Sequence, residues 1–134
     1  MTLKTRKTAL TAALSIMAAG SIAFIPASAM AADQTETTSQ FEVATTTDGV
    51  VKSGVKAYRK GDYEKAIALH RAAIKGSMSK RKTAVAQSNL CASWAMMGDL
   101  EQAEEACDTA LDLRPDYKPA LANKELLNIK LAQK

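Results

Sequence analysis

Two stretches of this chain share nearly the same pattern of residues. Residues 61–74 read GDYEKAIALHRAAI, and residues 98–111 read GDLEQAEEACDTAL. Each stretch begins with Gly-Asp and an apolar residue, carries alanines at matching positions and closes on Ile or Leu; the two starts lie 37 residues apart. A repeat of this period indicates stacked supersecondary units, each of which buries its apolar face against its neighbour. Such a chain is expected to offer a binding surface rather than an active site.

The first 31 residues predict a secretory signal peptide. Basic residues stand near the start, residues 9–25 are mostly apolar, and small residues follow Pro26. The pattern predicts cleavage after Ala31, with cleavage after Ala29 as the alternative. An uncleaved membrane anchor is the competing interpretation, but the run is Ala-rich and shorter than the roughly 20 strongly apolar residues that a span needs. We therefore expect an exported chain, periplasmic or secreted, with no membrane span in its mature part.

The charge of the mature chain gives no case for nucleic acid binding. The sequence has 18 basic and 14 acidic residues, and the signal peptide contains three of the basic ones, so the mature net charge is +1 (15 basic against 14 acidic). The charges are nevertheless separated, with a net +7 over residues 48–82 and a net −6 over residues 83–117. This separation either orients a partner or a second copy, or belongs to solvated outer helix faces.

The mature chain is predicted to be all-α. Residues 32–46 are Thr-rich and polar, with Phe41 and Val43 as the only bulky apolar residues, which predicts a flexible linker. Beyond them, apolar residues recur at helical spacing, and no period-two run of β-branched residues predicts a strand. The expected helices cover residues 48–60, 63–75, 79–97, 100–113 and 119–133.

The two units resemble tetratricopeptide repeats. In the second unit the matching residues are Leu90, Cys91, Trp94, Gly98, Asp99, Ala103, Cys107, Ala110, Leu111 and Pro115. In the first unit they are Gly54, Gly61, Asp62, Tyr63, Ala66, His70, Ala73 and Ile74. The first unit departs from the pattern because Met78 replaces its closing proline, and the 37-residue spacing exceeds the family's period of roughly 34 residues.

The resemblance implies a helical repeat domain over residues 47–134. It consists of two antiparallel helix pairs, about 47–78 and 84–117, and a capping helix over 118–133, which together form a fragment of an α-solenoid. In this last helix Asn123 fits the pattern, but Lys124-Glu125 stands where Leu-Gly would be, on the face against which a following helix would pack. We therefore expect the opposite side, with Leu121, Leu126 and Ile129, to rest on the second unit.

The resemblance also implies where a partner binds. In the family, peptides lie in a groove lined by the first helix of each unit. Here that surface is mostly apolar and comprises Val51, Val55, Tyr58, Arg59, Val85, Ser88, Asn89, Ala92, Ala95 and Met96. The subtype that grips a C-terminal carboxylate uses Lys and Asn at positions that Val51 and Val55 occupy in this chain. Of the residues of that clamp only Asn89 is present, so we expect this chain to have no carboxylate clamp.

The two cysteines of the mature chain fall on facing sides of one predicted helix hairpin. An exported protein meets an oxidising compartment, which predicts a disulfide between Cys91 and Cys107. The short loop that it closes gives on the order of 3 kcal/mol in the chain-entropy model. The alternative is a pair of buried thiols that act as small core residues.

No motif in the sequence predicts catalysis or a cofactor. His70 is the single histidine and is expected to be half-buried in an aromatic slot of the repeat; a catalytic base or metal ligand is the alternative. A copper(I) site would use soft ligands, but the candidates follow no ligand spacing: Met78, Met96, Met97, His70 and the two thiols. We therefore expect a non-catalytic adaptor that binds a protein or peptide. The alternatives are a structural module that associates with its own copy and, less favoured, a small metal carrier or enzyme.

Overall fold

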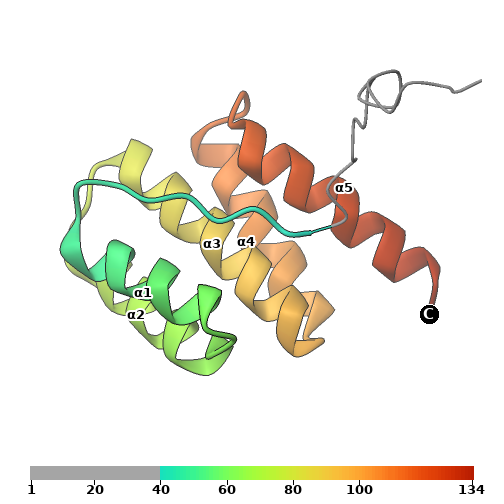
Figure 1. Cartoon of the computed structure of the whole chain (residues 1–134). Helices are drawn as coiled ribbons and strands as arrows, with labels where there is room; N and C mark the ends of the chain where they lie inside the picture. The colour runs from blue at the N-terminus through green and yellow to red at the C-terminus, as the bar shows by residue number, and fades with distance from the viewer. Residues whose placement is uncertain (1–39) are drawn as a thin grey trace, which may run out of the picture. The chain divides into compact units, whose positions relative to one another are not determined.

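The computed structural model describes residues 40–134, all of which belong to one compact unit. Within this range the chain forms α-helices and no strand, so the predicted all-α class is confirmed (Figure 1). The helices are α1 (Gly49–Arg59), α2 (Tyr63–Lys75), α3 (Lys80–Met97), α4 (Leu100–Leu113) and α5 (Lys118–Ala132). None of these helices combines the length and the apolar character that a membrane crossing requires. The predicted signal peptide, residues 1–31, and residues 32–39 lie outside the described part.

Gly-Asp turns join the helices into pairs. The side chains of Asp48, Asp62 and Asp99 accept hydrogen bonds from backbone N–H groups two or three residues later, at 2.8–3.2 Å. These bonds satisfy donors that the first turn of a helix leaves unpaired. Gly61 and Gly98 have φ angles of 79° and 87°, which glycine adopts without the strain of a side chain. Each Gly-Asp therefore ends one helix and begins the next, which makes α1–α2 and α3–α4 helical hairpins.

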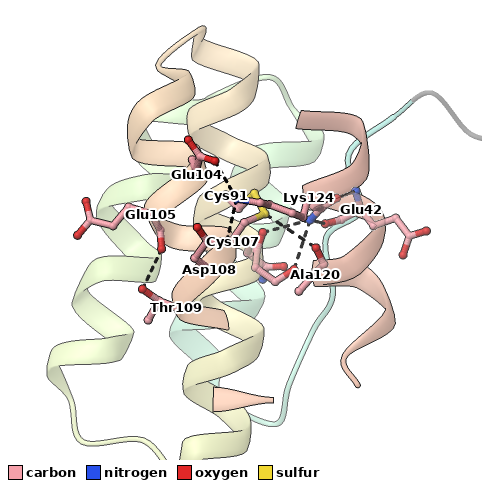
Figure 2. The surroundings of a disulfide bond; sticks show 12 residues. Glu42, Cys91, Glu104, Glu105, Cys107, Asp108, Thr109, Ala120 and Lys124 are labelled. Atoms are coloured by element: carbon pink, nitrogen blue, oxygen red, sulfur yellow. Dashed lines mark hydrogen bonds and ion pairs between the residues drawn. A yellow bond between two sulfur atoms is a disulfide. The ribbon is translucent and has the colours of Figure 1, made fainter. Parts of the chain in front are cut away.

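A contact at equivalent positions joins the two helices of each hairpin. In the first, the ring of His70 on α2 lies so close to α1 that a Cβ added to Gly54 would be 2.6 Å from its Cε1. In the second, Cys91 of α3 and Cys107 of α4 form a disulfide, with their Cα atoms 5.1 Å apart (Figure 2). The predicted disulfide is therefore confirmed. Each contact joins residues 16 positions apart, and the second lies 37 positions after the first.

The last helix packs on a different face from the one expected. Leu121 and Ile129 were predicted to rest on the second unit, yet they are 47% and 50% exposed, so this prediction is wrong. Leu126, from the same prediction, is partly buried against the main core. The buried face of α5 consists of Ala120, Asn123 and Leu127. The helix is therefore rotated about its axis relative to the prediction.

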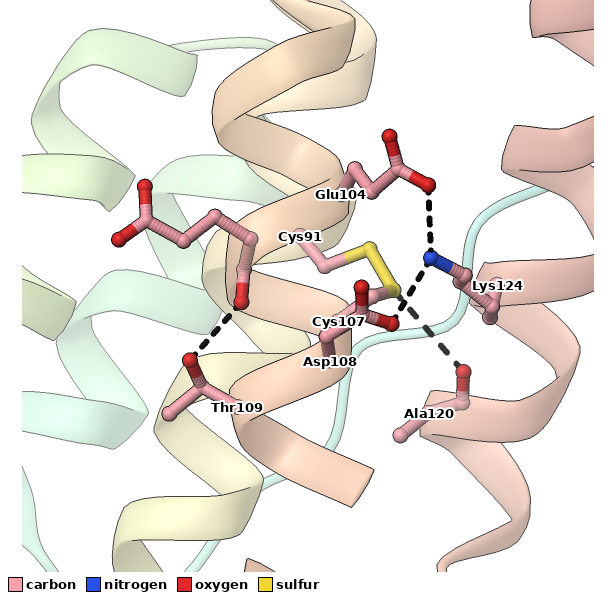
Figure 3. A network of polar contacts seen from close by, with 8 residues as sticks. Cys91, Glu104, Cys107, Asp108, Thr109, Ala120 and Lys124 are labelled. Atoms are coloured by element: carbon pink, nitrogen blue, oxygen red, sulfur yellow. Dashed lines mark hydrogen bonds and ion pairs between the residues drawn. A yellow bond between two sulfur atoms is a disulfide. The ribbon is translucent and has the colours of Figure 1, made fainter. Parts of the chain in front are cut away.

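Lys124 attaches α5 to α4. Its ammonium lies 2.8 Å from the Asp108 carboxylate and 2.9 Å from the Glu104 carboxylate (Figure 3). Burial alone lowers the pKa of Lys124, but its hydrogen bonds to Asp108 and Glu104 outweigh this effect, so its pKa lies above the ordinary value. The sequence suggested that Lys124 lies on a face that points away from the fold. Lys124 instead pairs with carboxylates of the preceding helix, α4.

His70 is completely buried in the first hairpin, more so than the half-buried position that an aromatic slot suggested. Neither ring nitrogen has a hydrogen-bond partner among residues 40–134. Burial lowers the pKa of His70 from 6.5 to about 4, because the ring cannot carry a charge there without solvent. The folded chain therefore holds a neutral imidazole at neutral pH.

This burial predicts an acid-sensitive first hairpin. Above pH 6.5 the His70 ring is neutral in both the folded and the unfolded chain, so it does not change the free energy of unfolding with pH. Between pH 6.5 and about 4 the unfolded chain binds a proton at His70 that the folded chain does not bind. The free energy of unfolding should fall by about 3 kcal/mol over this range because of His70 alone. Urea unfolding of the chain and of a His70→Phe variant at pH 7, 5.5 and 4 measures this term as the difference between the two. A difference that stays constant with pH would contradict the assignment.

Candidate functional site

Residues 40–46 form an extended segment that crosses the helices from α5 towards the start of α1 (Figure 1). Phe41 is 6% exposed and belongs to the main core cluster, and Val43 packs against the same cluster. Ala44 packs against a second cluster that includes Tyr117. The prediction of a flexible linker over 32–46 is therefore wrong for residues 40–46, since these residues are part of the packed fold.

Two asparagine side chains hold the backbone of this segment. Asn123 of α5 accepts a bond from the N–H of Glu42 at 2.6 Å and donates to the Glu42 carbonyl at 2.8 Å. Asn89 of α3 does the same with Ala44, at 2.9 Å and 2.8 Å. Each amide thereby forms the pair of bonds that a residue of a neighbouring antiparallel strand would form. Alternate residues of the segment are fixed in this way, independently of their side chains.

Burial holds both asparagines, and Ser88 orients the amide of Asn123. Asn123 and Asn89 are themselves completely buried. The amide nitrogen of Asn123 also lies 3.2 Å from the carbonyl and 3.3 Å from the hydroxyl of Ser88. The hydroxyl of Tyr58 donates to the carbonyl of Phe41 at 3.4 Å, next to the first of the two amide pairs. The backbone of the segment therefore meets a row of prepared donors and acceptors along its length.

The disulfide helps to place the two amides relative to each other. Cys91 stands two residues after Asn89 on α3 and is bonded to α4 through Cys107. The sulfur of Cys107 lies 3.9 Å from the Ala120 carbonyl on α5, one turn before Asn123 (Figure 2). The buried disulfide therefore adds a link through α4 to the direct contact between Ser88 of α3 and Asn123 of α5.

Most of the residues predicted to line a partner groove are buried. Val51, Val55, Val85, Ser88, Asn89, Ala92 and Ala95 are all buried. Tyr58 is half-buried, and Arg59 and Met96 are exposed. These last three line a hollow of about 540 Å³ beside Phe41, together with Tyr63 and Lys130. The open groove of the prediction is thus occupied in part by the chain's own segment, and its accessible remainder lies at the Phe41 end.

The sequence reasoning missed that Asn123, like Asn89, bonds the backbone of residues 40–46. It also missed the segment to which both bind, although it noted Phe41 and Val43 as the only bulky apolar residues of the supposed linker. Their alternation was the available signal, because a short period-two apolar pattern is typical of a half-buried extended strand.

The described residues show no cluster that could hold a metal. Within 40–134, no group of three or more His, Cys, Asp or Glu side chains comes together in the required way. His70 lies in the core beside Gly54, away from solvent, and the two sulfurs are bonded to each other.

Comparisons of the chain with protein-family models, with curated proteins and with solved structures found no match to any of them. The assignment of the site therefore depends on its geometry.

Removal of either amide should release the segment. In an Asn123→Ala variant the N–H and C=O of Glu42 lose their partners, and a lost hydrogen bond of this kind costs about 1–3 kcal/mol. We expect the backbone amide of Glu42 to exchange with deuterium about ten-fold faster or more, while amides in the middle of α2 keep their protection. Asn128→Ala is the matched control, since Asn128 is an exposed asparagine on the same helix. Equal protection of Glu42 in all three proteins would show that the amide does not hold the segment.

Proposed function

We propose that this chain is a non-catalytic adaptor that binds an extended polypeptide segment in the groove occupied by residues 40–46. The observation that carries the proposal is the pair of buried amides, Asn89 and Asn123, each bonded to both polar groups of one backbone residue. Backbone bonds of this kind accept many sequences, because they do not depend on the side chains of the bound segment. The resemblance to tetratricopeptide repeats, whose grooves bind peptides, supports the same function.

In this proposal the chain's own segment competes with the partner. Its attachment is intramolecular, so its effective concentration at the groove is on the order of millimolar. A partner that makes only the same contacts would not displace it at cellular concentrations. The partner must gain additional contacts, and the hollow beside Phe41, with Tyr58 and Met96 on its walls, is the accessible place for them.

The proposal includes export of the chain. The amino-terminal pattern of residues 1–31 supports a cleaved signal peptide and a periplasmic or secreted location. The disulfide between Cys91 and Cys107 supports the same location, since such bonds persist in oxidising compartments.

A second candidate function is a structural module that associates with its own copy. It is favoured by two large apolar side chains on α5, Leu121 and Ile129, which are exposed in the single chain. Light scattering of the purified chain separates the two functions, because a strict monomer favours the adaptor.

Competition with the segment tests the adaptor directly. A labelled peptide of residues 38–47 is titrated with the purified chain and with a Phe41→Ala/Val43→Ala variant, whose own segment has lost its apolar anchors. We expect fluorescence anisotropy to show at least ten-fold tighter binding to the variant than to the unchanged chain. Adding Asn123→Ala to the variant should abolish the gain, whereas adding Asn128→Ala should preserve it. If the double variant does not bind the peptide, the groove does not accept a segment in trans.

A further inference from the structure

A second cleft lies on α2, α3 and α4, and residues 40–46 do not line it. It has a volume of about 250 Å³. Its lining combines cations, apolar side chains, an indole and a carboxylate: Arg71, Lys75, Ile74, Leu90, Trp94 and Glu105. Neither the disulfide nor the two amides of the groove contribute to this lining, so the cleft is separate from the candidate site.

The cleft exists because α2 and α4 each pack on α3 but not on each other. Side chains of α3, among them Leu90 and Trp94, therefore form part of the lining between the two other helices. Figure 2 shows Glu105 and Thr109 on the side of α4 that faces away from Lys124. The same α4 thus attaches α5 on one side and borders the cleft on the other.

The positive charges of the cleft are available to a ligand. Arg71 is exposed, and its guanidinium lies 5.8 Å from the centre of the Trp94 ring. Lys75 stands one turn later on the same helix and is also exposed. Within residues 40–134, neither Arg71 nor Lys75 forms an ion pair. The basic residues that do so there are Arg114 and Lys124. A guanidinium oriented by an aromatic ring keeps its fork of N–H donors free for a carboxylate.

The size and the charge pattern together select the class of ligand. Pockets for cofactors and drug-sized molecules usually measure about 300–1,000 Å³, so a cleft below that range fits one or two side chains better than a whole cofactor. The acidic side chain Glu105 and the net negative charge of α4 oppose a polyanion such as nucleic acid. A polypeptide with a few carboxylates beside a large apolar residue matches both the cations and the apolar lining.

We propose that this cleft is a second binding site, for an acidic polypeptide segment that inserts one large apolar side chain. The apolar side chain lies against Ile74, Leu90 and Trp94, and a carboxylate of the same segment pairs with Arg71 and Lys75. Helix α3 then contributes to both sites, Asn89 to the groove and Trp94 to the cleft. A chain with two such sites joins two polypeptides, which goes beyond the binding of one segment in the groove.

Trp94 reports on this site, because it is the only tryptophan of the sequence. The probe is a blocked ten-residue peptide with three Glu, two Leu and otherwise Gly and Ser, and its counterpart has Lys in place of each Glu. We expect the acidic peptide to shift the Trp94 emission in a saturable manner that weakens as salt is added, and the basic peptide to leave it unchanged. No shift with the acidic peptide, or the same shift with both, would overturn the proposal.

Variants locate the binding with a second readout, the anisotropy of the labelled acidic peptide. Arg71→Gln/Lys75→Gln should weaken binding at least ten-fold. Lys52→Gln/Lys118→Gln removes the same charge from exposed positions outside the cleft and should retain the affinity. Equal affinities of the two double variants would mean that net charge rather than the cleft binds the peptide. The Asn123→Ala variant should bind the acidic peptide normally, so failure of the groove proposal and failure of the cleft proposal are distinguishable.

Discussion

The disulfide between Cys91 and Cys107 fixes the helix on which the rest of the described chain depends. Helix α3 packs on α1, α2, α4 and α5, whereas the other helices have fewer neighbours. A bond that closes a loop of this length restricts the unfolded chain by about 3 kcal/mol in the chain-entropy model. That is a large fraction of the roughly 5–15 kcal/mol by which a small domain is stable. The positions of Asn89 and of the Trp94 cleft both follow from where this helix is held.

The two hairpins meet the same packing requirement with different chemistry. In the first hairpin Gly54 lies against the imidazole ring of His70. The equivalent positions of the second hairpin hold the two bonded cysteines. The first hairpin has no covalent bond between its helices, and among residues 40–134 the two buried nitrogens of His70 have no hydrogen-bond partner, so its stability depends on pH. The second depends on the redox conditions instead. The two halves of the repeat therefore respond to different changes in their surroundings.

Local patterns in the sequence were sufficient for the helices and the disulfide, because caps, turns and helical spacing act over a few residues. Contacts between residues far apart in the sequence could not be predicted from such patterns. Glu42 and Asn123 are 81 positions apart, and neither residue type indicates that it pairs with the other. In α5 apolar residues occur all around the helix, so periodicity did not select its buried face, and only the carboxylates of α4 explain the place of Lys124. The accessible groove was overestimated because its occupant came from the supposed linker.

The bonds between Glu42 and Asn123 also connect the two ends of the described stack. Repeat arrays whose units contact only their neighbours lose terminal units one at a time, so their unfolding spreads inward from either end. Here residues at the start of the described range lie against the last described helix, α5. Separating the segment from α5 therefore breaks contacts of both the first and the last described residues, a link that an array with neighbour-only contacts lacks.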